Sequence, residues 1–210
     1  MNDQLQKAQR RTLQYWYIDG LHELTFGGIC LVVALLLFAQ TTLPKGTLLY
    51  TILIISFVLV IMGSAFLVGK VVSAFKSRLT FPRTGYVAYR RKSRTNNWII
   101  PLLGLGIVGL LALFIAKAPQ SLNLMTAVTG IVLASVMLAL GIRTGLLRFT
   151  LIGCISLILG GSLALTGIVD LLGLSIFYGS IGLVLGISGA CTLRTYLRKA
   201  PAAQESQDGK

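Results

Sequence analysis

The chain has 210 residues, of which 55% are hydrophobic and only 12% are charged, whereas soluble domains are typically about 25% charged. The net charge is +13, but the basic residues flank long apolar stretches, which favours a membrane protein over one that binds nucleic acid. The three cysteines lie within those stretches without the spacing of metal ligands. We therefore expect no nucleic-acid partner, no metal and no cofactor.

Residues 1–24 precede the first apolar stretch and combine basic with apolar and aromatic side chains. From residue 5 onwards the apolar positions, including Trp16, can share one helical face, with Lys7, Arg10 and Arg11 on the other. This pattern is typical of an amphipathic helix that lies in the membrane interface. We expect an N-terminal interfacial helix on the cytoplasmic side.

Six stretches that lack Asp, Glu, Lys and Arg follow, and each reaches the roughly 20 residues that a helix needs to cross a bilayer. Together they predict an all-α integral membrane protein, a six-transmembrane-helix bundle built as three helical hairpins within residues 25–199. The polar segment 200–210 is typical of a disordered tail. The predicted spans are about 25–43, 47–70, 98–116, 121–142, 149–168 and 171–193.

The distribution of Lys and Arg predicts the orientation. With the N-terminus inside, only Lys45 and Lys117 of the 19 basic residues lie outside. Cytoplasmic loops carry an excess of Lys and Arg, so this orientation agrees with the positive-inside rule. We expect a multi-pass protein of the plasma (inner) membrane with cytoplasmic N- and C-termini.

The loop 70–97 is the longest and carries eight basic residues. Alternating apolar residues on either side of a Pro-Arg-Thr-Gly turn predict a short cytoplasmic β-hairpin. One interpretation is that the basic residues only anchor the spans and set the topology. The other is a contact with anionic lipid or a partner protein. The candidate residues for that contact are Arg78, Arg83, Tyr86, Arg90, Arg91 and Lys92.

Asp19, His22 and Glu23 form the one cluster of catalytic-type ionisable residues, just before the first span. On a helix, Asp19 and Glu23 share a face. We expect these two acids to form salt bridges with loop arginines such as Arg78 or Arg83, which would close a cytoplasmic cap. The alternative is a metal or acid–base site that uses all three side chains.

Glycines recur at spacings of three and four in the last span, and Gly182 and Gly186 form a small-xxx-small pair. Such residues let helix backbones approach closely. We expect these two glycines to pack helices within one bundle, and the alternative is a homodimer that forms through the last span.

Two segments carry a resemblance: residues 19–24 (DGLHEL) before the first span and residues 80–87 (TFPRTGYV) in the basic loop. Together they resemble a group of uncharacterised bacterial polytopic membrane proteins. The resemblance covers roughly the N-terminal half of the chain and implies no activity. It implies a bacterial plasma membrane, with both segments in one cytoplasmic unit.

Three hypotheses of function follow. The favoured one is a non-enzymatic membrane protein whose basic cytoplasmic cap contacts anionic lipid or a partner protein. The first alternative is a small transporter or channel-like protein for a neutral or hydrophobic solute, which needs a continuous polar path from residues such as Asn123, Ser135, Ser156, Ser162 or Ser175. The second is a membrane enzyme that uses Asp19, His22 and Glu23.

Overall fold

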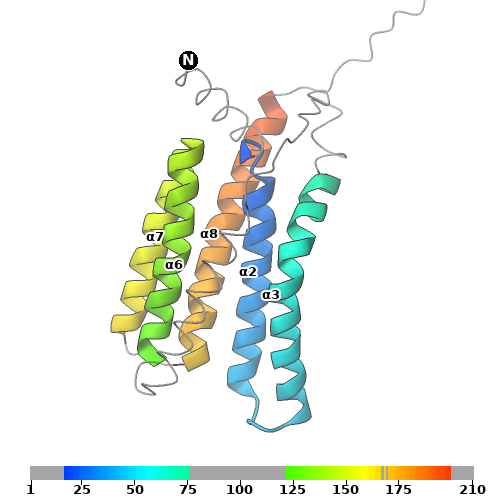
Figure 1. Ribbon diagram of the computed structural model, residues 1–210, viewed down its shortest axis with the longest axis vertical. Helices are drawn as coiled ribbons and strands as arrows, with labels where there is room; N and C mark the ends of the chain where they lie inside the picture. The colour runs from blue at the N-terminus through cyan, green and yellow to red at the C-terminus, as the bar shows by residue number, and fades with distance from the viewer. Residues whose placement is uncertain (1–16, 76–121, 167, 169, 200–210) are drawn as a thin grey trace, which may run out of the picture.

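The computed structural model describes residues 17–75, 122–166, 168 and 170–199. These residues form five helices and no strand, packed side by side as one bundle (Figure 1). The prediction of an all-α fold is therefore confirmed for this part of the chain. The helices are α2 (Leu21–Thr42), α3 (Leu48–Phe75), α6 (Leu122–Thr144), α7 (Leu147–Leu165) and α8 (Asp170–Lys199).

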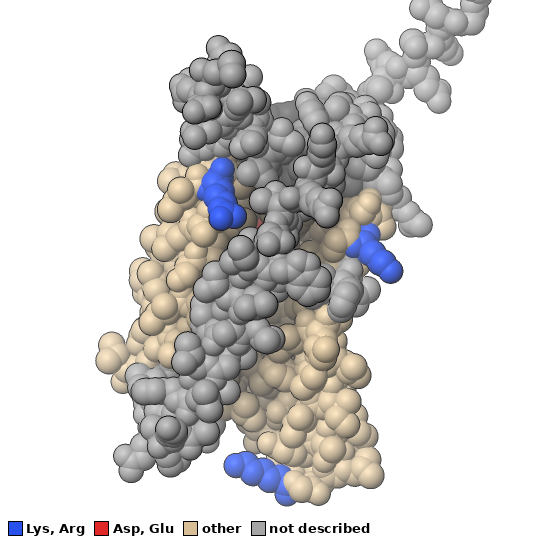
Figure 2. All heavy atoms as spheres, in the orientation of Figure 1, with Lys and Arg blue, Asp and Glu red and all other residues tan. Residues whose placement is uncertain are grey.

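The helices are apolar on their outer faces as well as their inner ones. Leu35 is 69% exposed, Ile142 is 72% exposed and Leu165 is 90% exposed, whereas a helix on the surface of a soluble protein turns a polar face outwards. In Figure 2 the tan surface that is visible between the blue side chains carries no Lys or Arg. Such an exterior suits the hydrocarbon of a bilayer, where helices satisfy their own backbone hydrogen bonds.

Four described helices are long and apolar enough to cross a membrane: α2, α6, α7 and α8. The helix α3 bends by 58° between Ser64 and Val68 and makes a fifth if its two parts are one span. These helices match five of the six predicted spans, although α2 begins at Leu21 rather than near residue 25. The remaining predicted span, 98–116, lies outside the described residues, as do the predicted β-hairpin, residues 1–16 and the tail 200–210.

The pairs α2–α3, α6–α7, α7–α8 and α2–α8 run antiparallel, whereas α6 and α8 run in the same direction, and the described helix termini lie at two opposite ends of the bundle (Figure 1). One end holds the start of α2, the end of α3, the α6–α7 turn and the end of α8. We call it the basic end, because its described basic side chains are those of Lys70, Arg143, Arg148, Arg194 and Arg198. The opposite end holds the α2–α3 turn with Lys45, and the start of α6.

Local sequence explains the helix boundaries. Gly20 precedes α2 with φ of 75°, a left-handed conformation that favours glycine. The side chain of Thr47 caps α3, because its hydroxyl accepts a hydrogen bond from the Tyr50 N–H at 3.3 Å. Gly145, with φ of 69°, ends α6, and its N–H donates to the Gly141 carbonyl at 2.7 Å.

Glycines produce the closest contacts between helices. A Cβ atom added to Gly27 on α2 would lie 2.8 Å from the backbone nitrogen of Gly186 on α8. The α6–α7 hairpin has the same feature, because a Cβ added to Gly130 would lie 2.9 Å from the Cα of Gly160. These approaches depend on the missing side chains, as is usual where membrane helices pack closely. Large side chains of α8, including Phe177, fill the core beside them.

Candidate functional site: a buried ion pair at the basic end

The start of α2 places two acidic side chains inside the bundle. Asp19 is 1% exposed and Glu23 is 2% exposed. A carboxylate of Asp19 accepts a hydrogen bond from the Leu21 N–H at 3.3 Å, across the turn at Gly20. A buried carboxylate is costly unless it is paired, so the partners of Glu23 determine how this end is held.

Glu23 joins three helices through its two carboxylate oxygens. Oε1 lies 2.7 Å from Nε of Arg148, in the first turn of α7. Oε2 accepts a hydrogen bond of 2.7 Å from the Ser188 hydroxyl on α8. The side chain of Glu23 is 1% exposed and that of Arg148 is 21% exposed, so the ion pair lies at the border between the buried core and the surface.

Arg148 makes further contacts that tie α7 to the segment before α2. Its Nη2 group donates a hydrogen bond to the backbone carbonyl of Tyr17. The Tyr17 ring packs edge-on against the ring of Phe149, with centroids 5.7 Å apart. The Arg148 guanidinium also lies 5.4 Å from the centroid of that Phe149 ring. The cluster of Tyr17, Glu23, Arg148, Phe149 and Ser188, called here the polar latch, therefore holds α2, α7 and α8 together.

An open pocket of about 420 Å³ lies beside the polar latch. Arg148 is its charged residue, and most of the other lining side chains come from the last turns of α8. The lining consists of Ile18, Arg148, Cys191, Thr192, Thr195 and Tyr196.

The three residues of the enzyme hypothesis do not converge around this pocket. Asp19 bonds the backbone of its own turn, and Glu23 is occupied by Arg148 and Ser188. The His22 ring packs against Tyr17, with centroids 4.8 Å apart. Among the residues that the structure describes, no three His, Cys, Asp or Glu side chains are grouped so as to hold a metal ion. Within the described residues, these three side chains therefore form no metal-binding group, and Glu23 is engaged in the ion pair with Arg148.

The serines of the transporter hypothesis are dispersed. The buried hydroxyls of Ser156 and Ser175 donate to backbone carbonyls of neighbouring helices, at 3.1 Å to Gly130 and 2.8 Å to Ala34. Ser135 and Ser162 are exposed and bond the backbone of their own helices. The Asn123 side chain lies outside the described part. The hydroxyls of Ser156 and Ser175 thus link neighbouring helices, whereas those of Ser135 and Ser162 bond within their own helices.

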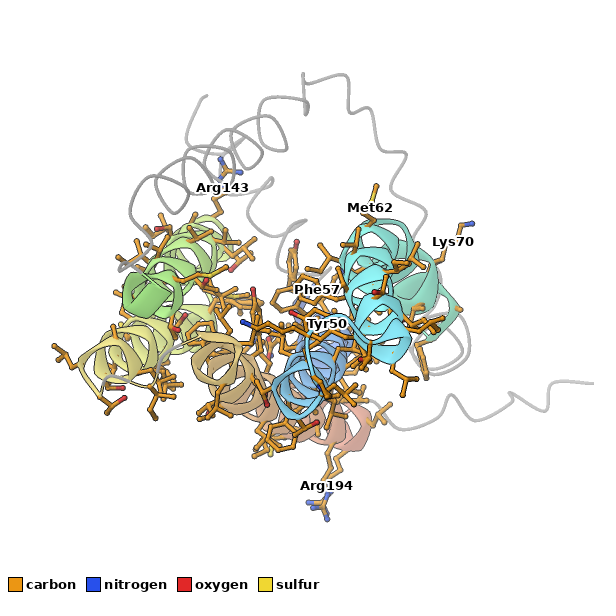
Figure 3. The ribbon with its side chains drawn as sticks, turned by 90° about the horizontal axis from the view of Figure 1, so that it is seen from below. Tyr50, Phe57, Met62, Lys70, Arg143 and Arg194 are labelled. Carbon is orange, nitrogen blue, oxygen red and sulfur yellow. The ribbon has the colours of Figure 1, made fainter. Side chains whose placement is uncertain are left out.

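Exposed basic side chains lie at the same end of the bundle as the polar latch. Figure 3 shows Lys70, Arg143 and Arg194 pointing away from the bundle, and all three are exposed. Arg198 is exposed as well. The acidic residues described at this end, Asp19 and Glu23, are both buried, so its described surface is positively charged.

The structure places several predicted site residues. Glu23 pairs with Arg148, a partner that the sequence analysis did not name, whereas the proposed partners Arg78 and Arg83 lie outside the described residues. Gly182 lies against α2, because a Cβ added there would meet the Gly27 carbonyl at 3.0 Å. The backbone nitrogen of Gly186 lies near Gly27 of α2, but a Cβ added to Gly186 would meet nothing within 4 Å, so the close approach depends on Gly27 and Gly182. The remaining candidates for a lipid or partner contact, Tyr86, Arg90, Arg91 and Lys92, also lie outside the described part.

Arg148 and Ser188 are the site residues that sequence reasoning missed. In the sequence, Arg148 is one of the basic residues that set the topology. One signal could have revealed its role: two acids at the membrane border need cationic partners on the same side, and nine of the seventeen basic residues expected there lie outside the long loop, Arg148 among them.

The comparisons with known proteins add no identity to this geometry. No protein-family model matches the chain, and no curated protein and no solved structure is significantly similar to it.

Proposed function

We propose that this chain is a non-enzymatic, six-span protein of the plasma membrane whose basic end lies at the cytoplasmic face and contacts anionic lipid headgroups. The observation that carries the proposal is the asymmetry of exposed charge between the two ends. Lys70, Arg143, Arg194 and Arg198 are exposed at one end, and Lys45 is the described basic residue at the other. Positive charge of this kind collects on the cytoplasmic side of membrane proteins.

The positions of the described helix ends support an even number of crossings. The helix α3 ends at the basic end, and α6 begins at the opposite end (Figure 1). We propose one crossing between Phe75 and Leu122, by the apolar stretch 98–116, which would join these two ends and give six crossings in total when α3 counts as one span.

The same exposed side chains determine the free energy of attraction to an acidic leaflet. Each Lys or Arg near an acidic leaflet contributes about 1 kcal/mol to the attraction, reduced by salt screening. Arg148 is left out of this sum because Glu23 already neutralises it. The four exposed residues therefore set an upper limit of roughly 4 kcal/mol for the described part of the basic end.

Cysteine accessibility tests the orientation. Lys45→Cys and Arg143→Cys are introduced separately into a variant in which Cys30, Cys154 and Cys191 are replaced by Ala. In intact cells, a membrane-impermeant maleimide should label the cysteine at 45, and it should label the one at 143 only after permeabilisation. The reverse pattern would refute the proposed orientation, and labelling of both in intact cells would refute opposite sides for the two ends.

Lipid selectivity tests the headgroup contact. The protein is reconstituted in mixed bilayers, and the association of spin-labelled phosphatidylglycerol is compared with that of phosphatidylcholine. Arg143→Gln should lower the preference for phosphatidylglycerol up to about fivefold, because about 1 kcal/mol corresponds to that factor. The matched control is Lys45→Gln, at the opposite end. This substitution should not change the preference for phosphatidylglycerol in the leaflet at the basic end. Equal effects of the two substitutions would contradict the proposal.

A further inference from the structure

The pocket beside the polar latch has the composition of a phosphate site. Among its described lining residues, Arg148 is the charged one and Tyr196 contributes a phenol hydroxyl, whereas the Thr192 and Thr195 hydroxyls donate to the Ser188 and Cys191 carbonyls of α8. Arginine presents its N–H donors in a fixed planar fork that suits phosphate oxygens. The described lining residues include no carboxylate, and Glu23 contacts Arg148 from the buried side.

The contacts of Arg148 leave donors for a ligand. The guanidinium has five N–H groups. Within the described part of the chain, Nε faces Glu23 and one N–H of Nη2 donates to the Tyr17 carbonyl, so the two N–H groups of Nη1 and the second one of Nη2 remain. Glu23 and Tyr17 thereby hold the guanidinium in one orientation before any ligand arrives, which lowers the entropic cost of binding.

The surface on either side of the pocket suits the rest of a phospholipid. Ile187 and Leu183 precede Cys191 on α8 by four and eight residues, so they follow the same face of the helix towards the middle of the bundle. They are 64% and 56% exposed. In the other direction Arg198 lies one turn beyond Thr195 and adds positive charge at the rim. A phospholipid whose phosphate lies in the pocket would therefore place its acyl chains on an apolar surface.

From these observations we infer that the pocket formed by Ile18, Arg148 and the last turns of α8 binds the headgroup phosphate of one anionic phospholipid. The acyl chains then lie along Ile187 and Leu183 of α8. This inference deepens the proposed function, on which it rests, because it assigns one lipid to a defined site within the general headgroup contact.

Cys191 provides a direct probe of occupancy, since its thiol is exposed and lines the pocket. A Cys30→Ala/Cys154→Ala protein in neutral detergent keeps Cys191 alone, and its reaction with N-ethylmaleimide is timed during titration with phosphatidylglycerol. A matched control carries Cys191→Ala as well and Arg194→Cys, because Arg194 lies on the same helix and points away from the bundle (Figure 3). Phosphatidylcholine and inorganic phosphate form two further arms.

Phosphatidylglycerol should slow the labelling of Cys191 about fivefold or more, because an occupied pocket shields the thiol. The effect should saturate once the pocket is filled. Labelling at position 194 should change little. Equal slowing at both positions would overturn the inference, since it would reflect only the charge of the micelle. Equal protection by inorganic phosphate would overturn the lipid assignment, and equal protection by phosphatidylcholine would overturn the selectivity for an anionic lipid.

The role of Arg148 is tested by removing both charges of the ion pair together. Glu23→Gln/Arg148→Gln leaves no unpaired charge between these two positions, so the protein should stay folded, as circular dichroism and gel filtration can check. In the double variant, the concentration of phosphatidylglycerol that gives half-maximal protection of Cys191 should rise about tenfold or more, because a charged hydrogen bond to the phosphate is lost. Unchanged protection in the folded double variant would overturn the inference.

A second variant covers the case in which the double variant does not fold. Tyr196→Phe removes one pocket hydroxyl, and it should weaken the protection severalfold. Unchanged protection in Tyr196→Phe would then overturn the inference.

Failure of the pocket and failure of the proposed function are distinguishable. If Arg143→Gln lowers lipid selectivity but phosphatidylglycerol does not protect Cys191, the general headgroup contact stands and the defined site is refuted. If neither effect appears, both are refuted.

Discussion

Two adjacent glycines of α2 allow a sharp test of the helix packing, because one faces α8 and the other faces outwards. A Cβ added to Gly27 would lie 2.8 Å from the Gly186 nitrogen and 2.9 Å from the Gly182 carbonyl oxygen. A Cβ added to Gly28 would meet nothing within 4 Å. Gly27→Ala and Gly28→Ala therefore make the same chemical change one residue apart, with opposite consequences for packing.

The expected magnitudes follow from these distances. Ordinary van der Waals contact for a Cβ is 3.4–4 Å, so the new methyl group of Gly27→Ala must push two rigid backbone segments of α8 away by about half an ångström or more. Overpacking of this kind costs about 1–3 kcal/mol. Gly28→Ala should instead stabilise by up to about 1 kcal/mol, because alanine is the better helix former.

The assay is reversible unfolding of the purified protein in mixed micelles of dodecyl maltoside and sodium dodecyl sulfate, followed by circular dichroism. Gly27→Ala should unfold at a lower mole fraction of dodecyl sulfate than the parent protein, and Gly28→Ala at the same fraction or a higher one. The pair Gly160→Ala and Gly161→Ala repeats the test on α7, because a Cβ would lie 2.9 Å from the Gly130 Cα at position 160 but in open space at position 161.

The reasoning would be refuted by equal midpoints for the two α2 variants, or by a less stable Gly28→Ala. Either result would mean that α2 and α8 do not pack through Gly27 as the structure has them. If only the two α7 variants differed in their unfolding midpoints, the α2–α8 contact would be wrong and the α6–α7 contact would stand.

Two further predictions concern buried groups. Arg148→Gln should destabilise by about 3–5 kcal/mol, because it leaves the carboxylate of Glu23 buried with only a hydroxyl partner. Glu23→Gln should cost less, since the Arg148 side chain is 21% exposed and can reach water; a larger cost for Glu23→Gln in the same unfolding assay would contradict this account. In native detergent solution, Cys154 and Cys191 should react readily with N-ethylmaleimide, whereas Cys30, which is 3% exposed, should react only after unfolding. Mass spectrometry of the labelled protein distinguishes the three thiols, and early modification of Cys30 would argue against the buried contact of α2.

Much of the fold was predictable because transmembrane helices are encoded locally. An apolar stretch of the required length without charges predicts a span whatever its neighbours are, and α6, α7 and α8 occupy the stretches at 121–142, 149–168 and 171–193 closely. The boundary of α2 was harder to predict. Asp19, Gly20 and Glu23 were assigned to an interfacial segment before the span, but Gly20 starts the helix at Leu21 and brings both acids into the bundle.

Only part of the candidate site could be predicted. The sequence indicates that Asp19 and Glu23 are acids at the membrane border and that such acids need cationic partners there. Which cation serves could not be read from spacing, because Glu23 and Arg148 are 125 positions apart and meet only once α2, α7 and α8 have packed.

The composition and the positions of the charges thus sufficed for an all-helical bundle with an apolar exterior and unequal charge at its two ends, since both properties depend on single segments. The tertiary structure alone decided that Gly27 and Gly182 face each other, that Ser188 and Arg148 converge on Glu23, and that a pocket opens beside them. The physical reason is that helix pairing depends on the shapes of two surfaces at once. In a membrane, that pairing is driven by close packing and interhelical hydrogen bonds, which no single stretch of sequence specifies.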